Sequence, residues 1–165
     1  MRLDEAKETF IQAWGNLGSS WGINRTMGQV HALLLLSKES LSSDQIMETL
    51  DISRGNANMN IRALIEWGLV FKESREGERR EYFYGEKDML RILQKIVQQR
   101  KKKELTPIVE LLDTLSDVDS STKEGAEFLS VIEDIQYFAQ KTDKVLDKLV
   151  NKDPNWIMNL LIKAV

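Results

Sequence analysis

Two short helical patterns, a tight turn and two strand-like runs follow one another between Ser42 and Tyr84. Ser42 is a favoured N-cap residue, and apolar residues recur behind it at helical spacing. After the turn, Ser53 can cap a second helix. Two runs rich in β-branched and aromatic residues then flank a charged stretch, Arg75 to Arg79, in which Gly77 suits a turn. The order helix, turn, helix and hairpin predicts a winged helix-turn-helix, a mainly α fold with a small β-hairpin wing.

The second of these helices, predicted over residues 53–66, has two sides of different character. Steps of about 100° per residue give it an apolar side that should face the core: Ala57, Ile61, Leu64 and Ile65. The opposite side and its flanks hold residues that do not form a core: Gly55, Asn56, Asn58, Met59, Asn60, Arg62 and Ala63. Asparagine and glycine are poor helix formers, so a contact outside the protein would explain their number here. Because asparagine matches the major-groove edge of adenine and arginine that of guanine, this side is predicted to read DNA.

The candidate DNA contacts divide into two groups by their chemistry. Base reading is assigned to amide and guanidinium groups of the second helix: Asn56, Asn60 and Arg62. Phosphate binding is assigned to the start of that helix and to the hairpin: Ser53, Arg54, Arg75 and Arg79. The predicted interface is completed by Gly55, Asn58, Met59 and Arg80. Glu76 and Glu78 lie among the hairpin arginines, so an ordinary charged surface hairpin is the alternative to a DNA-binding wing.

Over residues 14–90 the chain resembles a known family. Residues 53–70, Ser-Arg-Gly-Asn-Ala-Asn-Met-Asn-Ile-Arg-Ala-Leu-Ile-Glu-Trp-Gly-Leu-Val, are similar to the recognition-helix signature of the GbsR-like branch of MarR-type bacterial transcription regulators. Three further stretches resemble the same branch: residues 21–28, 32–37 and 77–84. The resemblance implies a winged-helix homodimer that binds an operator, modulated in some members by small molecules. The namesake members are tied to choline and glycine betaine metabolism.

The N-terminal segment 3–19 carries an apolar stripe at helical spacing and is predicted to form an amphipathic helix. Near its end, Gly15 and Gly18 interleave with Trp14 and Trp21, an arrangement that would let a second backbone or a ligand approach. Two tryptophans beside glycines can cage a cationic amine, whereas packing in a core or a dimer interface is the alternative. Trp14 and Trp21 are therefore kept as a candidate site for a small-molecule effector beside the packing interpretation.

The next predicted helix begins near Thr26, which can cap it, and contains the continuous apolar run Ala32 to Leu36. So long an apolar run implies burial on most sides, and this helix is predicted to be the central scaffold. His31, the single histidine, lies within it. It has no second type of ligand at a useful spacing, so a structural role is predicted and no metal site.

After the hairpin, apolar residues recur at helical spacing from Met89 onwards. Pro107 either begins a new helix or kinks the continuing one, so a boundary is predicted near Thr106. A loop at 117–122 leads to another long amphipathic helix, and a short closing helix is predicted over 155–165.

Long amphipathic helices at both ends of a winged-helix core need cover, which the same helices of a second copy can provide. We therefore expect a homodimer with N- and C-terminal dimerisation helices. The predicted organisation is a DNA-binding domain over 1–88, which includes the N-terminal helix, and a helical linker and dimerisation region over 89–165.

The formal net charge of −3 is not the basic balance that phosphate binding usually leaves. Residues 1–104 hold 17 Lys and Arg against 15 Asp and Glu, whereas residues 105–165 hold 6 against 11. The acidity therefore lies mainly in the C-terminal third, and DNA binding would depend on placement and base contacts. The acidic balance favours the main alternative, a winged-helix adaptor that binds protein and no DNA.

Several classes of protein are disfavoured by what the sequence lacks. No apolar run approaches the roughly 20 residues that span a bilayer, and the N-terminus is too charged for a signal peptide, so a cytoplasmic protein is expected. The absence of cysteine excludes disulfides and thiol chemistry. No nucleophile and base pair or glycine-rich phosphate loop is recognisable, so neither an enzyme nor a cofactor is predicted. The predicted function is a sequence-specific transcription regulator, a repressor that acts as a homodimer on a palindromic operator of double-stranded DNA.

Overall fold

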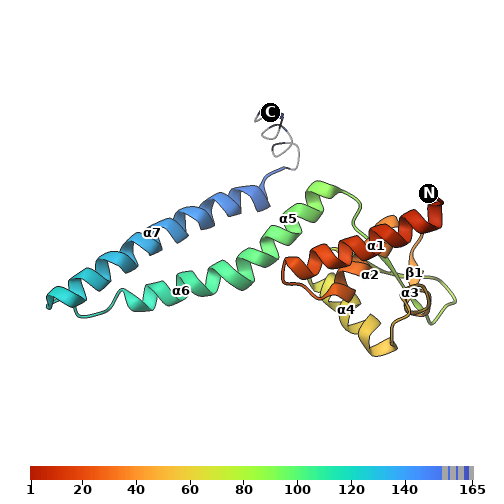
Figure 1. Ribbon diagram of the computed structural model, residues 1–165, viewed down its shortest axis with the longest axis horizontal. Helices are drawn as coiled ribbons and strands as arrows, with labels where there is room; N and C mark the ends of the chain where they lie inside the picture. Colours follow the sequence, from red (N-terminus) through yellow and green to blue (C-terminus); the bar gives the residue numbers. More distant parts are fainter. Residues whose placement is uncertain (154–155, 157–158, 160–161, 164–165) are drawn as a thin grey trace. The chain divides into compact units, whose positions relative to one another are not determined.

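The computed structural model describes residues 1–153, 156, 159, 162 and 163. The chain divides into two compact units, Met1–Ile92 and Leu93–Val165, each of which is described by itself. The helices and strands are labelled in Figure 1. The division falls within a helix, a few residues after the boundary expected between residues 88 and 89.

The first unit begins with two closely packed helices, α1 (Leu3–Ser20) and α2 (Arg25–Leu36). Their backbones meet at two glycines, since a Cβ atom added to Gly28 would lie 3.0 Å from the Cα of Gly15. A side chain at either position would separate the helices. The second backbone expected beside the N-terminal glycines is therefore that of α2. Helix α2 begins two residues earlier than predicted because the side chain of Asn24, not that of Thr26, accepts the capping hydrogen bond.

Helix α2 is the scaffold of this unit, as its apolar run predicts. The largest fully buried side chains come from α2, from the helices, strand and turn around it and from the start of α5: Val30, Leu34, Ile46, Ile61, Leu64, Leu69, Val70 and Ile92. Burial of such side chains is the main favourable contribution to folding, at roughly 1.5–3 kcal/mol each. This core fixes the position of the two helices that follow.

The helix-turn-helix consists of α3 (Ser43–Leu50) and α4 (Arg54–Glu66), and its local signals act as predicted. The Ser42 hydroxyl accepts a hydrogen bond from the backbone N–H of Gln45, and the Ser53 hydroxyl accepts one from that of Asn56. Gly68 follows α4 with φ of 71°, the left-handed conformation in which glycine ends helices. The two helices and their turn are thus specified by the local sequence.

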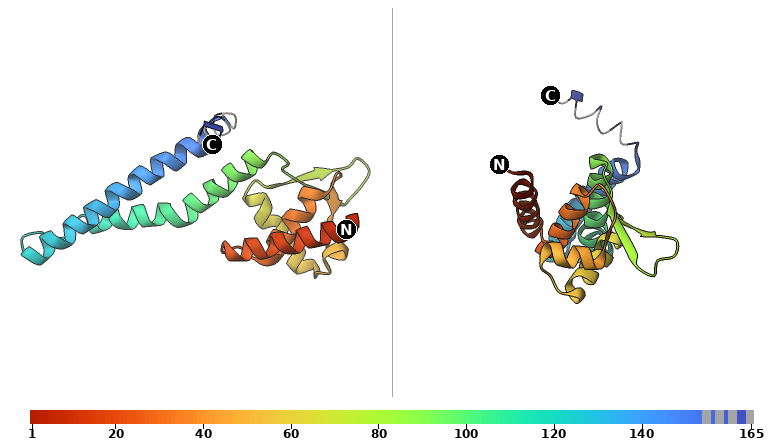
Figure 2. Two further views of the ribbon diagram at one scale, coloured as in Figure 1. Left: turned by 45° about the horizontal axis from the view of Figure 1, so that its top comes forward. Right: turned by 90° about the vertical axis from the view of Figure 1, so that its right-hand side faces the viewer.

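The wing is an antiparallel hairpin of β2 (Val70–Ser74) and β3 (Glu81–Gly85). Its register pairs Val70 with Gly85 and Ser74 with Glu81. A two-residue strand, β1 (Leu41–Ser42), adds to the free edge of β3 and gives the order β1-β3-β2. Figure 2 shows the hairpin extending beyond the helices of this unit.

A nearly continuous helical path leads through α5 (Met89–Arg100), a π-helical segment (Lys101–Leu105) and α6 (Thr106–Leu115). Helix α6 begins at Thr106, where a boundary was predicted, yet the chain keeps its helical course there. Proline is tolerated in the first turn of a helix because the N–H groups of that turn need no helical partner.

Within the second unit, α7 (Lys123–Asn151) packs against α6. The contact buries Leu112, Ile132 and Ala139. Lys101 joins the two sides of this unit, since its ammonium group lies 3.1 Å from Asp143 and 2.5 Å from Asp147. The predicted closing helix at 155–165 falls largely on residues outside the described ranges. Within those ranges, none of the helices combines the length and the hydropathy that crossing a bilayer requires.

Candidate nucleic-acid interface

One side of α4 is open to solvent and is lined by small and polar residues. It forms a shallow hollow of about 500 Å³, bordered by Gly55, Asn58, Met59, Arg62, Ala63 and Glu66. Met59, on the same side, is 57% exposed. A Cβ atom added to Gly55 would meet no atom of the described residues within 4 Å, so none of them covers this glycine. We call these six residues the α4 face.

The α4 face differs from the predicted one by a rotation of the helix about its axis. Asn60, predicted to read bases, is only 2% exposed, and Ile65, predicted to face the core, is exposed. At 100° per residue, the exposed arc is centred on Arg62 and not on Met59, a shift of roughly 60°. The prediction that Asn60 is exposed for base reading is therefore wrong, whereas Asn58 lies fully on the open side.

Asn60 is buried because its side chain finds its partners inside α4. Its amide nitrogen donates to the Oδ1 atom of Asn56 at 2.7 Å and to the backbone oxygen of Asn56 at 2.8 Å. A buried amide with two acceptors avoids the cost of an unsatisfied polar group. Asn60 thus positions Asn56, which is half-buried at the edge of the α4 face.

The start of α4 holds the predicted phosphate contacts Ser53 and Arg54. Ser53 is exposed and caps the helix, so free backbone N–H groups of the first turn point outward beside its hydroxyl group. The guanidinium group of Arg54 lies 3.1 Å from Asp44 of α3, and both side chains are largely exposed. Exposed ion pairs of this kind contribute little to stability, so Arg54 can exchange Asp44 for another anion at small cost.

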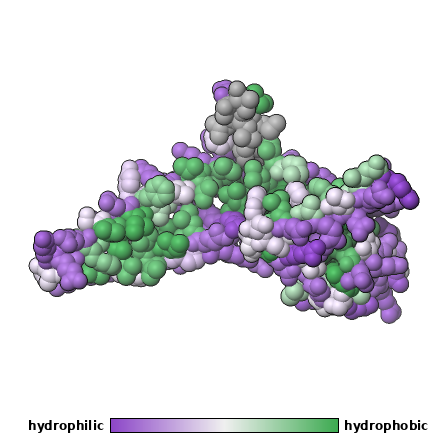
Figure 3. Space-filling view, in the orientation of Figure 1, coloured by the Kyte–Doolittle hydropathy of each residue, from purple (hydrophilic) through white to green (hydrophobic). Residues whose placement is uncertain are grey.

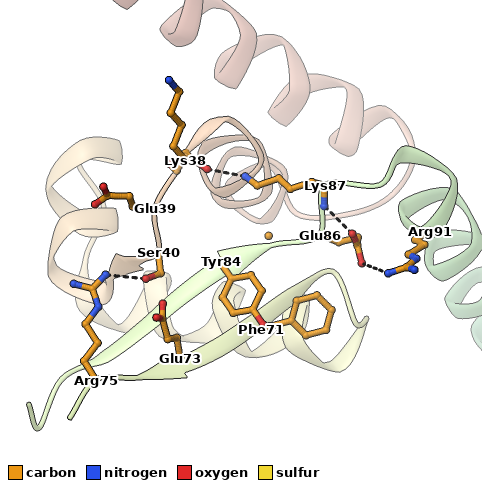
Figure 4. Close-up of a pocket in the computed structure, with 12 residues that line it drawn as sticks. Lys38, Glu39, Ser40, Phe71, Glu73, Arg75, Tyr84, Glu86, Lys87 and Arg91 are labelled. Carbon is orange, nitrogen blue, oxygen red and sulfur yellow. Dashed lines mark hydrogen bonds and ion pairs between the residues drawn. The ribbon is translucent and has the colours of Figure 1, made fainter.

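At the wing, the structure separates Arg75 from the other two arginines. The Arg75 guanidinium lies 3.8 Å from the centre of the Tyr82 ring and donates to the Ser40 hydroxyl at 2.9 Å. Figure 4 shows Arg75 turned toward Ser40. Arg79 and Arg80 are exposed near the tip. Arg75 therefore anchors the hairpin to Ser40, just before β1, and the phosphate contact predicted for it stays a prediction.

The hydroxyl group of Tyr82 completes this anchor. It donates to the carboxylate of Glu78, and this bond is the largest of the effects that raise the pKa of Tyr82 above its ordinary value. Glu78 is one of the two glutamates expected to lower the positive charge of the wing. Its carboxylate keeps this charge and also bonds to Tyr82 within the hairpin.

A groove of about 660 Å³ lies beside the hairpin and was not foreseen from the sequence. Phe71 and Tyr84 stand next to each other in it, with ring centres 5.4 Å apart (Figure 4). Lys87 donates from its ammonium group to the backbone oxygens of Leu34, Leu35 and Ser37 at 2.6–2.7 Å. Burial lowers the pKa of Lys87. The strand register, which sets Phe71 opposite Tyr84, is the signal that could have revealed the aromatic pair.

The two tryptophans of the predicted effector site have different surroundings. The Trp14 indole N–H donates to Nδ1 of His31 at 3.2 Å, and the Trp14 ring stacks on Phe10 at 5.2 Å. Trp21 is 55% exposed just after the end of α1. Trp14 thus contributes to packing between α1 and α2, and the effector site remains a prediction.

His31 is buried between α1 and α2. Burial, with a smaller effect of the nearby Lys87 charge, lowers the pKa of His31 to about 4. Its Nε2 atom has no hydrogen-bond partner among the described residues. The neutral ring therefore accepts from Trp14 on Nδ1 and carries its proton on Nε2.

Comparison with known proteins agrees with this geometry. Residues 21–81 match the model of the MarR family. The chain is also similar to a solved structure described as the crystal structure of a transcriptional regulator. The superposition has a TM-score of 0.68, covers 88% of this chain and 95% of the other, and the two sequences are 18% identical. No curated protein matches the chain. The fold is thus a winged helix, mainly α with a small three-stranded antiparallel sheet, and its residues 21–81 are similar to the MarR family.

Proposed function

Starting from a MarR-type winged helix over residues 21–81, we propose that the protein is a sequence-specific DNA-binding transcription regulator. The observation that carries this proposal is the α4 face, an exposed helix side on which small, amide and guanidinium-bearing residues lie beside Met59 and Glu66. In a winged helix-turn-helix, the second helix of the motif enters the major groove. Gly55 and Ala63 would let the α4 backbone approach the bases closely.

We assign base reading to Arg62 and Asn58, with Asn56 contributing from the edge of the face. Arginine pairs with the O6 and N7 atoms of guanine and asparagine with the N6 and N7 atoms of adenine. Phosphate contacts are assigned to the start of α4 and to the wing tip: Ser53, Arg54, Arg79 and Arg80. Since few basic groups are available, affinity would depend on the fit of these contacts more than on net charge.

The regulator is proposed to act as a homodimer of the GbsR-like branch, most simply as a repressor that occupies a palindromic operator. A two-fold axis would present two copies of α4 to successive major grooves about one helical turn apart. A small-molecule effector near Trp14 and Trp21 would act by moving α1 and so changing the spacing of the two α4 helices. Exposed apolar side chains on the helices support the dimer, including Leu17 of α1 and Phe138 of α7.

The test is selection from random DNA duplexes at low and moderate salt, followed by sequencing. The wild type should enrich an inverted repeat, and an Asn58→Ala, Arg62→Ala double variant should lose that enrichment while keeping its helical content. Lys38→Ala is the matched control, because it removes an exposed cation outside the α4 face and should select the same sequence. If the wild type enriches nothing, or the double variant selects the same repeat, the α4 face does not read DNA. A protein-binding adaptor then becomes the better proposal, as the acidic composition would favour.

A further inference from the structure

Helix α7 has an apolar row that no part of the described chain covers. One of its sides packs on α6 through Ile132 and Ala139. A second row remains exposed: Phe128, Val131, Ile135, Phe138 and Val145. Its steps are of three, four and three residues and then of seven, because the half-buried Thr142 stands between Phe138 and Val145. Phe138, near the middle of the helix, is 73% exposed. Figure 3 shows apolar surface gathered over α6 and α7.

The spacing of this row indicates what kind of surface would cover it. An average step of 3.5 residues is the repeat by which one helix packs lengthwise on another. A contiguous exposed apolar row of this length is typical of an interaction site. The partner should therefore be a helix of similar length.

Four charges border the exposed row at intervals of seven residues. Glu127 and Asp134 lie in the N-terminal half of α7, and Lys141 and Lys148 lie in the C-terminal half. All four are exposed, and two have exposed neighbours on the same helix: Glu127 lies 3.8 Å from Lys123, and Lys141 lies 5.1 Å from the centre of the Tyr137 ring. The two other aspartates of the C-terminal half, Asp143 and Asp147, are engaged by Lys101 on a different side of the helix.

These charges make α7 complementary to a second copy of α7 that runs in the opposite direction. The pairs Glu127 with Lys148 and Asp134 with Lys141 share one midpoint, between residues 137 and 138. A two-fold axis at this midpoint would bring each acidic residue to the basic residue of the other copy, as isologous contacts require. The same axis places Phe138 beside its own copy. A parallel pairing would instead bring acidic residues together and basic residues together.

We propose that α7 pairs antiparallel with α7 of a second copy of this chain, centred on residues 137 and 138. The apolar row supplies the contact area, and the flanking charges set direction and register, as border charges do in paired helices. The inference rests on the proposed function only for the homodimer, to which it gives an interface. Its test uses no DNA.

The first experiment reverses the charges in the full chain and measures association by analytical ultracentrifugation at low salt. A Glu127→Lys, Asp134→Lys variant and a Lys141→Glu, Lys148→Glu variant should each dimerise at least about tenfold more weakly than the wild type, because like charges then face each other. An equimolar mixture of the two should recover a heterodimer. The matched control, Glu133→Lys with Lys144→Glu, changes exposed charges away from the row and should dimerise like the wild type.

The second experiment tests the register through oxidative cross-linking, which the absence of cysteine in the natural chain makes specific. Phe138→Cys should cross-link with itself. Glu127→Cys and Lys148→Cys should each fail to do so alone and should cross-link when mixed. A monomeric wild type would overturn both the homodimer and this interface. A wild-type dimer that ignores the charge reversals and gives no register-specific cross-link would overturn the interface alone, and DNA selection would still decide the function separately.

Discussion

The side-chain amide of Asn60 holds that of Asn56, one turn earlier in α4, through a hydrogen bond of 2.7 Å to its Oδ1 atom. A buried polar group thereby fixes an amide at the edge of the surface proposed to read DNA. Asn60 is in this sense a positioning residue, since its own side chain is not accessible to a base.

Asn60→Ala should lower both stability and operator affinity. The change removes two buried hydrogen bonds and leaves a small cavity, so we expect a loss of about 1–3 kcal/mol in the free energy of unfolding. Urea unfolding followed by circular dichroism measures this loss. The control is Asn58→Ala, which should leave stability within about 0.5 kcal/mol because Asn58 is exposed. Equal stability losses in the two variants would contradict the role of Asn60.

Met59 should make the protein bind an operator that contains thymine more tightly than one that contains uracil at the same position. Its exposed side chain lies on the α4 face, where an apolar group can contact a thymine methyl. Replacing thymine by deoxyuridine, one position at a time, should weaken wild-type binding by roughly 3- to 5-fold at one position of each half-site, because burying one such group contributes about 0.8 kcal/mol. Met59→Ala should abolish this difference. Equal losses in Met59→Ala and the wild type would assign the methyl contact to another residue.

Arg79 and Arg75 should differ in what their removal changes. Arg79→Gln is expected to reduce the slope of log affinity against log salt by about 1, with stability unchanged, because an exposed cation is removed from a phosphate. Arg75→Gln should instead lower the free energy of unfolding by about 1 kcal/mol, since it removes the contacts with Tyr82 and Ser40. Fluorescence titrations at several salt concentrations, beside unfolding curves, measure both quantities. A steeper loss of salt dependence in Arg75→Gln than in Arg79→Gln would reverse these assignments.

His31 should make the protein less stable in mild acid. Its pKa is lowered to about 4 in the fold, below the ordinary 6.5, so between these values the unfolded chain binds a proton that the folded chain excludes. Stability is therefore lost as the pH falls from about 6.5 toward 4, by an amount on the order of 3 kcal/mol. Unfolding curves across this range should show a smaller loss in His31→Phe than in the wild type. Trp14→Phe, which removes the donor but keeps the histidine, is the control and should retain the loss.

Features set by neighbouring residues could be predicted from the sequence. The serine caps at Ser42 and Ser53, the left-handed Gly68 and the hairpin around Gly77 all depend on residues within a few positions of each other. The same is true of the apolar run that makes α2 central.

Features set by distant residues could not be predicted. A helical wheel shows which residues share a side of α4, but it does not show how the helix is rotated about its axis relative to the core. Asn60 and Ile65 were therefore assigned to the wrong sides. The contact of the Arg75 guanidinium with the Tyr82 ring depends on the strand register and on Ser40, which lies 35 positions earlier in the chain. The two-residue strand β1 is too short to give an alternating pattern.

Lys87 has a consequence for the order in which the protein takes shape during synthesis. Three backbone oxygens at the end of α2 accept hydrogen bonds from the ammonium group of Lys87, which follows them by 50 to 53 positions in the chain. As the chain leaves the ribosome, α2 emerges first and its last carbonyl groups remain bound to water until the hairpin has been made and Lys87 has followed it. The end of the central helix is thus completed only after the wing has been made, and a nascent chain that stops short of Lys87 lacks these three hydrogen bonds.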